Sequence, residues 1–87
     1  MIYIHMTVAG WRYESPNHRQ RTRMLDKCGK KCFLGPHKSF PICKKNTCKI
    51  SKKGITAAYM RARQYSSIKG TRKYKNIARK AYTLLHY

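Results

Sequence analysis

Four cysteines lie close together near the middle of this 87-residue chain, and the rest of the sequence has none. They are Cys28, Cys32, Cys43 and Cys48, in the spacing C-x3-C-x10-C-x4-C. In a chain of this length, such a cluster restricts the fold to one small domain organised around the linked segment. Two kinds of site satisfy the pattern. One is a pair of disulfide bonds, for which three pairings exist, and the other is a four-thiolate zinc site.

The residues around the cysteines are compatible with both kinds of site. Both short spacings fall within the range of structural zinc sites, and the many nearby lysines would stabilise thiolates. His37 could replace one cysteine as a zinc ligand, although a lone histidine in a Gly-Pro loop is more often simply solvated. Disulfides would instead staple a domain that is too small to rely on burial alone. Unconnected thiols are the third alternative.

The charge of the chain is strongly one-sided, with 21 lysines and arginines against two acidic residues and a net charge of +19. Glu14 and Asp26 are the only acidic side chains, which argues against paired-carboxylate catalysis and carboxylate-bound Mg²⁺ or Ca²⁺. The chain is also too short for the βαβ repeats of a nucleotide-binding enzyme. We therefore predict a protein that is not an enzyme, with no small-molecule substrate and no cofactor other than zinc in the alternative above.

The excess positive charge lies entirely within residues 18–87, because residues 1–17 carry one basic and one acidic side chain. Self-repulsion at this charge density is unfavourable for an isolated protein, so a polyanion is the expected partner. Nucleic acid is the most frequent such partner of strongly basic domains. No apolar run approaches the length of a membrane span.

The first 16 residues differ from the rest of the chain in charge composition, and a domain boundary is expected near Ser15–Asn17. Residues 2–8 alternate apolar and polar side chains, which is a strand pattern without a visible partner. We predict an extended arm over residues 1–16 that is disordered or adds to another chain's sheet. An alternative is that translation starts at Met24, which would remove this arm.

Residues 17–87 are predicted to form a single domain. Asn17 can cap a short helix that ends at Cys28, where Gly29 can close it. Loops rich in Gly and Pro follow over residues 28–48, and their apolar residues are expected to form a satellite core around the cross-link. These residues are Phe33, Leu34, Phe40 and Ile42.

Two helices are predicted at the C-terminal end, over residues 52–66 and 71–86. Each has an apolar stripe at helical spacing, and the short connection makes them antiparallel neighbours. Alanines on both stripes would allow close approach: Ala58, Ala62, Ala78 and Ala81. The predicted fold class is therefore small and mostly α, with a cysteine-crosslinked loop region, an antiparallel helix pair and an extended N-terminal arm.

Several pieces of the sequence together resemble short, basic, cysteine-bearing proteins of large nucleocytoplasmic DNA viruses. The pieces are Cys32-Phe33-Leu34-Gly35-Pro36, Phe40-Pro41-Ile42-Cys43 and Ala57-Ala58-Tyr59-Met60-Arg61-Ala62-Arg63, and the resemblance covers about residues 24–85. It implies a viral protein located in the virion, as a minor capsid or core component, and in the host cytoplasm or nucleus during infection. Because virions can hold oxidised cysteines, the resemblance favours disulfides over zinc.

The predicted function is electrostatic binding of DNA, or of acidic capsid proteins, without sequence specificity. The alternative is a zinc-stabilised nucleic-acid-binding regulator that acts in the infected cell. Tyr65 and Tyr82 are expected to be freer to contact a partner than Tyr59 and Tyr74, which lie on the apolar stripes and are expected to pack in the core. The predicted polyanion-binding residues are the basic side chains of the helical region: Lys49, Lys52, Lys53, Arg61, Arg63, Lys69, Arg72, Lys73, Lys75, Arg79 and Lys80.

Overall fold

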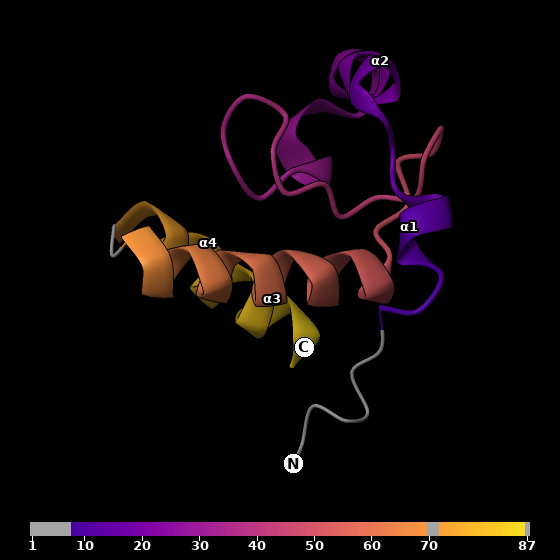
Figure 1. Ribbon diagram of the computed structural model, residues 1–87. Helices are drawn as coiled ribbons and strands as arrows, with labels where there is room; N and C mark the ends of the chain where they lie inside the picture. Colours follow the sequence, from indigo (N-terminus) through magenta and orange to yellow (C-terminus); the bar gives the residue numbers. More distant parts are fainter. Residues whose placement is uncertain (1–7, 70–71, 87) are drawn as a thin grey trace.

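The computed structural model describes residues 8–69 and 72–86, and this part of the chain is mostly helical (Figure 1). The elements in chain order are α1 (Trp11–Glu14), α2 (His18–Cys28), the 3-10 helix η2 (Gly29–Cys32), α3 (Lys52–Lys69) and α4 (Arg72–Leu85). Within the described ranges, extended backbone pairs only as two isolated antiparallel bridges, Phe33 with Pro41 and Cys43 with Ile50. The predicted small, mostly α fold class is confirmed.

The helix α2 begins and ends where the sequence predicts. The side-chain oxygen of Asn17 accepts a hydrogen bond from the Gln20 amide at 2.8 Å, and the Gln20 side chain accepts one from the Asn17 amide at 2.8 Å. This reciprocal capping box satisfies two amide groups that a helix start leaves without partners. At the other end, Gly29 adopts a positive φ of 75°, which a residue with a side chain rarely does.

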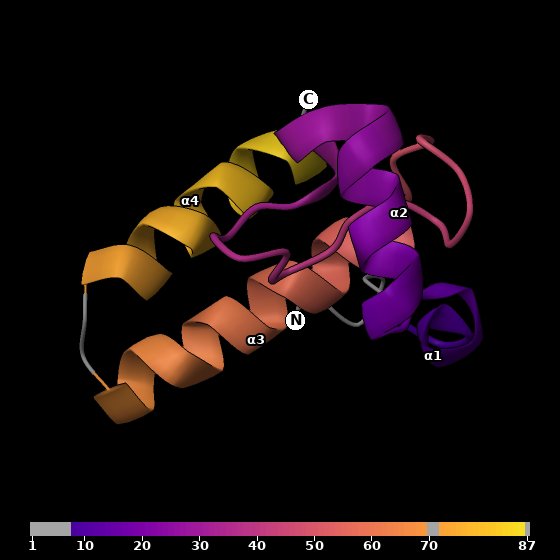
Figure 2. The same ribbon diagram turned by 90° about the horizontal axis from the view of Figure 1, so that it is seen from above.

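The helices α3 and α4 form the predicted antiparallel pair, in which α4 returns along α3 (Figures 1 and 2). Ala62 and Ala81 are completely buried between them, so small side chains do allow the close approach. The helix α3 extends to Lys69, beyond the predicted end at residue 66. Serine is only mildly unfavourable in a helix, and packing of Tyr65 against the core offsets that cost.

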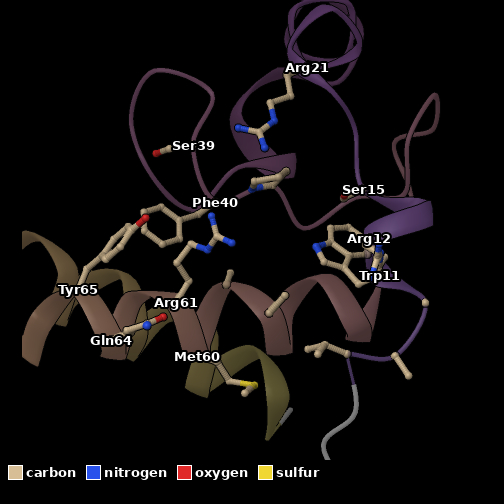
Figure 3. A pocket seen from close by; sticks show the side chains of 16 residues that line it. Trp11, Arg12, Ser15, Arg21, Ser39, Phe40, Met60, Arg61, Gln64 and Tyr65 are labelled. Atoms are coloured by element: carbon tan, nitrogen blue, oxygen red, sulfur yellow. The ribbon is translucent and has the colours of Figure 1, made fainter.

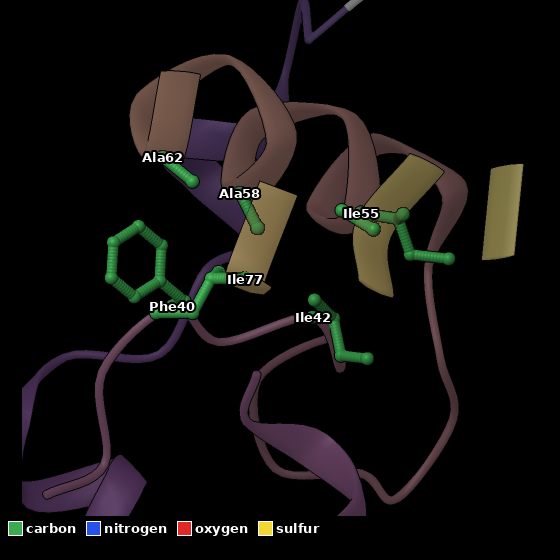
Figure 4. Packing of buried hydrophobic residues seen from close by; sticks show 7 residues of the cluster. Phe40, Ile42, Ile55, Ala58, Ala62 and Ile77 are labelled. Atoms are coloured by element: carbon green, nitrogen blue, oxygen red, sulfur yellow. The ribbon is translucent and has the colours of Figure 1, made fainter. Parts of the chain in front are cut away.

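The loop between α2 and α3 contributes to two cores instead of the single satellite core that the sequence predicted. Phe33 packs with Met24 beside the buried Cys32 and Cys43. Phe40 and Ile42 instead enter the core of the helix pair, as Figure 4 shows. Adjacent residues of an extended segment point to opposite sides, so Ile42 faces the helices while Cys43 faces the cross-link.

The N-terminal region differs from the predicted extended arm. Residues 11–14 form a helical turn, and Trp11 is buried with only 9% of its surface exposed. A side chain at Gly54 of α3 would place its Cβ 2.7 Å from the Trp11 ring, so the indole lies directly against that glycine. The free energy gained by burying the large indole offsets the conformational entropy that this segment loses when it becomes ordered. The predicted strand falls mainly on residues 1–7, which lie outside the described residues.

Candidate polyanion-binding surfaces

The four cysteines are paired as two disulfides, Cys28–Cys48 and Cys32–Cys43. Their Cα–Cα separations are 5.4 Å and 5.0 Å. The pairing is nested, which means that the 28–48 bridge encloses the 32–43 bridge in the sequence. Cys28 and Cys32 lie four residues apart, where α2 passes into η2. The turn over residues 44–49 brings the other two cysteines alongside them. The disulfide interpretation is confirmed, and in this form none of the four sulfur atoms is a thiolate ligand.

The outer face of α4 collects five of the predicted binding residues. All five are exposed to solvent, because the apolar stripe of α4 faces α3: Arg72, Lys73, Lys75, Arg79 and Lys80. The sequence from residue 52 to residue 85 contains no acidic side chain. The α4 basic face, as we call these five residues, therefore has no carboxylate on either helix of the pair to neutralise it.

The predicted binding residues on α3 lie on different sides of the molecule. Lys53 forms an ion pair with Glu14 of α1, with 3.2 Å between Nζ and Oε2. Arg63 donates a hydrogen bond to the Tyr59 hydroxyl at 3.0 Å, and its guanidinium lies 5.7 Å from the centre of that ring. Arg61 lies on the opposite flank of α3 from Arg63, because two residues along a helix correspond to a rotation of about 200°.

The remaining predicted residues, Lys49, Lys52 and Lys69, precede α4 in the chain. Lys49 is exposed beside Cys48, where its carbonyl accepts a hydrogen bond from the Lys44 amide at 3.1 Å. Lys52 is exposed at the first position of α3. The side chain of Lys69 lies outside the described part of the structure.

Among the tyrosines, one expectation was wrong. Tyr65 is not free, because its ring contacts Phe40 and Tyr74 at centroid distances of 6.2 Å and 5.3 Å. Tyr59 and Tyr74 pack against the core of the helix pair as expected. Tyr82 is half exposed, and its ring stands 4.1 Å from the His86 ring.

A groove between α3 and the loop segments above it is a feature that the sequence did not reveal (Figure 3). Its volume is about 620 Å³, and Arg12, Arg21 and Arg61 line it. Arg21 donates from Nε to the Pro16 carbonyl and from Nη1 to the Lys38 carbonyl, both at 3.2 Å. Partial burial, and to a lesser degree the nearby positive charge of Arg61, lower the pKa of Arg21.

No periodic signal links Arg21 with Arg61, because forty residues separate them and they lie on different helices. The loop between α2 and α3 packs against α3 through Phe40 and Ile42, and only this packing brings the two arginines to the same groove. The described helices also include none that is both long enough and apolar enough to cross a membrane.

Comparison with protein-family models, with curated proteins and with solved structures found no match for this chain. The resemblance to proteins of large DNA viruses therefore stays a prediction.

Proposed function

We propose that this protein is a non-enzymatic nucleic-acid-binding protein that contacts DNA electrostatically and without sequence specificity, mainly through the α4 basic face. The observation that carries this proposal is the accumulation of five exposed cations on one side of a 14-residue helix. Contacts of this kind to phosphates position a protein on DNA but do not select a sequence.

The spacing of the cations on α4 supports an anionic partner. Arg72 and Lys75 are three residues apart, and Lys75 and Arg79 are four apart, so they are neighbours on the helix surface. Like charges at these spacings destabilise an isolated helix by about 0.2–0.5 kcal/mol per pair. A phosphate backbone beside the helix reverses this penalty. The α4 basic face is therefore more stable in a complex than alone.

The half-exposed ring of Tyr82, with His86 beside it, adds an aromatic surface near the C-terminal end of the same helix. Rings next to cations can stack on unpaired bases, irrespective of the base. We expect a moderate preference for single-stranded over duplex DNA, which the variant Tyr82→Ala reduces without a change in salt dependence.

A salt titration with fluorescently labelled random-sequence DNA tests the proposal. If about eight cations each neutralise a phosphate, the logarithm of affinity falls with the logarithm of salt at a slope of about −7. The triple variant Arg72→Gln, Lys75→Gln, Arg79→Gln is expected to weaken this slope by about 3.

The matched control removes the same charge from the exposed row on α2, in the variant Arg19→Gln, Arg23→Gln, Lys27→Gln. We expect this control to change the slope by less than about 1, since each lost phosphate contact contributes about 0.9. Equal losses in the two variants would contradict the assignment to α4. Binding that does not depend on salt would contradict the electrostatic mechanism itself.

We further propose that the protein acts in a virus particle, where it binds packaged DNA or acidic capsid surfaces. The resemblance of residues 24–85 to proteins of large DNA viruses supports this, as does the disulfide pairing, because disulfides persist on virions and are rare in reduced cytosol. Proteomic analysis of purified particles is the test. The protein's presence only in infected-cell extracts would contradict it.

The alternative, a zinc-stabilised regulator of nucleic-acid function, requires the same four cysteines as thiolates. Intact-mass measurement of the protein from infected cells, under denaturing conditions with and without reductant, distinguishes the two. The disulfide form is lighter than the thiol form by about 4 Da, one hydrogen for each sulfur atom. A thiol-form mass, together with one zinc per native chain, would favour the regulator.

A further inference from the structure

The groove beside α3 combines positive charge with an apolar lining. Three arginines line it, Arg12, Arg21 and Arg61, and none of the described residues that line it is acidic. Phe40 and Met60 contribute apolar surface. Such a groove is complementary to a ligand that carries negative charge and apolar groups side by side.

Two of these arginines approach one another from opposite sides of the groove. Figure 3 shows Arg21 extending from α2 toward α3 and Arg61 extending from α3 toward α2. Two backbone carbonyls hold the guanidinium of Arg21 in place, whereas Arg61 is exposed. Two like charges held this way repel each other, and an anion between them would turn that repulsion into attraction. An arginine fork also matches the geometry of a carboxylate.

The apolar part of the groove fits aliphatic side chains better than bases. Trp11 and Phe40 each keep only 9% of their surface exposed, so neither of these rings offers an open face on which a base can stack. Tyr65, the third aromatic residue of the lining, is half-buried, and its ring packs against Phe40 and Tyr74. Met60, in contrast, has 52% of its surface exposed. Methionine is flexible and polarizable, and it adapts to partners of different shape.

We infer that this groove docks a short acidic segment of a partner protein, in which Asp or Glu residues alternate with aliphatic ones. Carboxylates of the segment lie between Arg21 and Arg61, and its aliphatic side chains rest on Met60. Phe40 closes the inner wall. This site is separate from the α4 basic face, so it would allow the protein to hold an acidic protein partner and DNA at the same time.

The chain carries its own probe for this site, because Trp11 lines the groove and is the single tryptophan of the sequence. A synthetic ten-residue peptide of alternating Asp and Leu, with blocked ends, is titrated into the full-length protein at physiological salt. We expect a saturable change in tryptophan emission. The same peptide with Asn in place of Asp, and a peptide of Asp and Ser, are expected to bind at least tenfold more weakly.

The variant Arg61→Gln is expected to weaken binding of the Asp-Leu peptide at least tenfold, because the charged partner of the carboxylate is lost. Arg63→Gln is the matched control, since it removes the same charge from the same helix on the opposite flank, and we expect less than a twofold change. Met60→Ser is expected to weaken binding of the Asp-Leu peptide and to leave DNA binding unchanged. Circular dichroism verifies that each variant remains folded.

Three outcomes would overturn the inference: no emission change with the Asp-Leu peptide, equal losses in the Arg61 and Arg63 variants, or equal affinity of the Asn peptide. A fourth outcome would reassign the groove. In this outcome a short oligonucleotide changes the tryptophan emission, the change is lost in the Arg61→Gln variant, and the peptide causes no change. The groove is then a nucleic-acid site. The α4 triple variant leaves the groove intact. A failure of DNA binding at the α4 basic face is therefore distinguishable from a failure of peptide binding at the groove.

Discussion

The two halves of this molecule are stabilised by different means. Residues 17–51 form α2, η2 and loops around two disulfides, with Met24 and Phe33 as the main apolar side chains beside them. Residues 52–85 form a helix pair that has no covalent link and is stabilised by packing of apolar side chains. The difference shows how a chain of 87 residues can use cross-links where its sequence is too polar and irregular to form a large core.

The two halves are nevertheless one unit, because the cross-linked half supplies part of the helical core. Ile42 is 1% exposed and packs among residues of α3 and α4 (Figure 4). Its neighbour Cys43 belongs to the disulfide-centred cluster. The segment around these two residues therefore couples the cross-links to the helix pair, and variants on either side of it test the coupling.

The largest expected effect is loss of the buried disulfide in the double variant Cys32→Ala, Cys43→Ala. Both cysteines are completely buried, so the change leaves a cavity as well as a freer unfolded chain, and we expect a loss of about 3–5 kcal/mol. The comparison variant Cys28→Ala, Cys48→Ala removes a partly buried bridge and should cost about 2–3 kcal/mol. Chemical denaturation followed by circular dichroism measures both.

These two variants separate burial from loop closure as the source of stabilisation. Loop closure by itself favours the 28–48 bridge by about 0.5 kcal/mol, because its sequence separation is 20 against 11. If the 28–48 variant is the less stable of the two, chain entropy dominates and our comparison is wrong.

The second effect concerns the coupling between the halves. The variant Ile42→Ala removes a buried side chain from the helical core and is expected to lower the free energy of unfolding by about 2–5 kcal/mol. Ile50→Ala is the control, since Ile50 is 48% exposed, and it should change stability by less than about 0.5 kcal/mol. Similar losses in the two variants would mean that the halves are not coupled through Ile42.

A smaller effect is expected where the N-terminal segment meets α3. Gly54→Ala should gain about 1 kcal/mol of helix propensity. The new Cβ would, however, meet the Trp11 ring at 2.7 Å and the Ile42 carbonyl oxygen at 2.9 Å. We expect a net loss of about 1–2 kcal/mol, with altered tryptophan emission.

A double-mutant cycle with Trp11→Ala is the control for this prediction. The penalty of Gly54→Ala should become smaller when the indole is absent, because one of the two close contacts has been removed. A net gain in stability from Gly54→Ala alone would show that the segment moves aside without cost.

The smallest effect is expected from the ion pair between Glu14 and Lys53. Their side chains are 28% and 39% exposed, so the variant Glu14→Gln should cost about 0.2–1 kcal/mol at low salt and less at high salt. Asp26→Asn removes the other acidic side chain, which is exposed on α2, and serves as the control. Thermal denaturation at two salt concentrations measures both, and a loss that does not depend on salt would contradict an electrostatic origin.

Local features of the chain were predicted well from the sequence. Asn17 and Gly29 mark the ends of α2 because capping and positive φ depend on nearby backbone. The stripes of α3 and α4 were visible as periodic patterns because each helix buries one side. The end of α3 was missed, since the contacts of Tyr65 with Phe40 and Tyr74 outweigh the weak local signal of two serines.

The candidate sites were predicted less completely. The cationic residues of α4 share a face by helical geometry, so spacing alone identified them. Arg61 was placed in the same set, although the structure turns it toward Arg21 and away from α4. Spacing along one helix cannot show which distant segment covers it.

The sequence by itself determined the existence of the three long helices α2, α3 and α4, the one-sided charge and the fact that four cysteines form a single local cluster, because each of these depends on residue type and short-range spacing. The tertiary structure decided the nested cysteine pairing, the burial of Trp11 against Gly54, and the opposition of Arg21 and Arg61 across a groove. Each of these depends on how segments that are not adjacent in the chain pack together and exclude water, and that free energy belongs to the packed molecule as a whole.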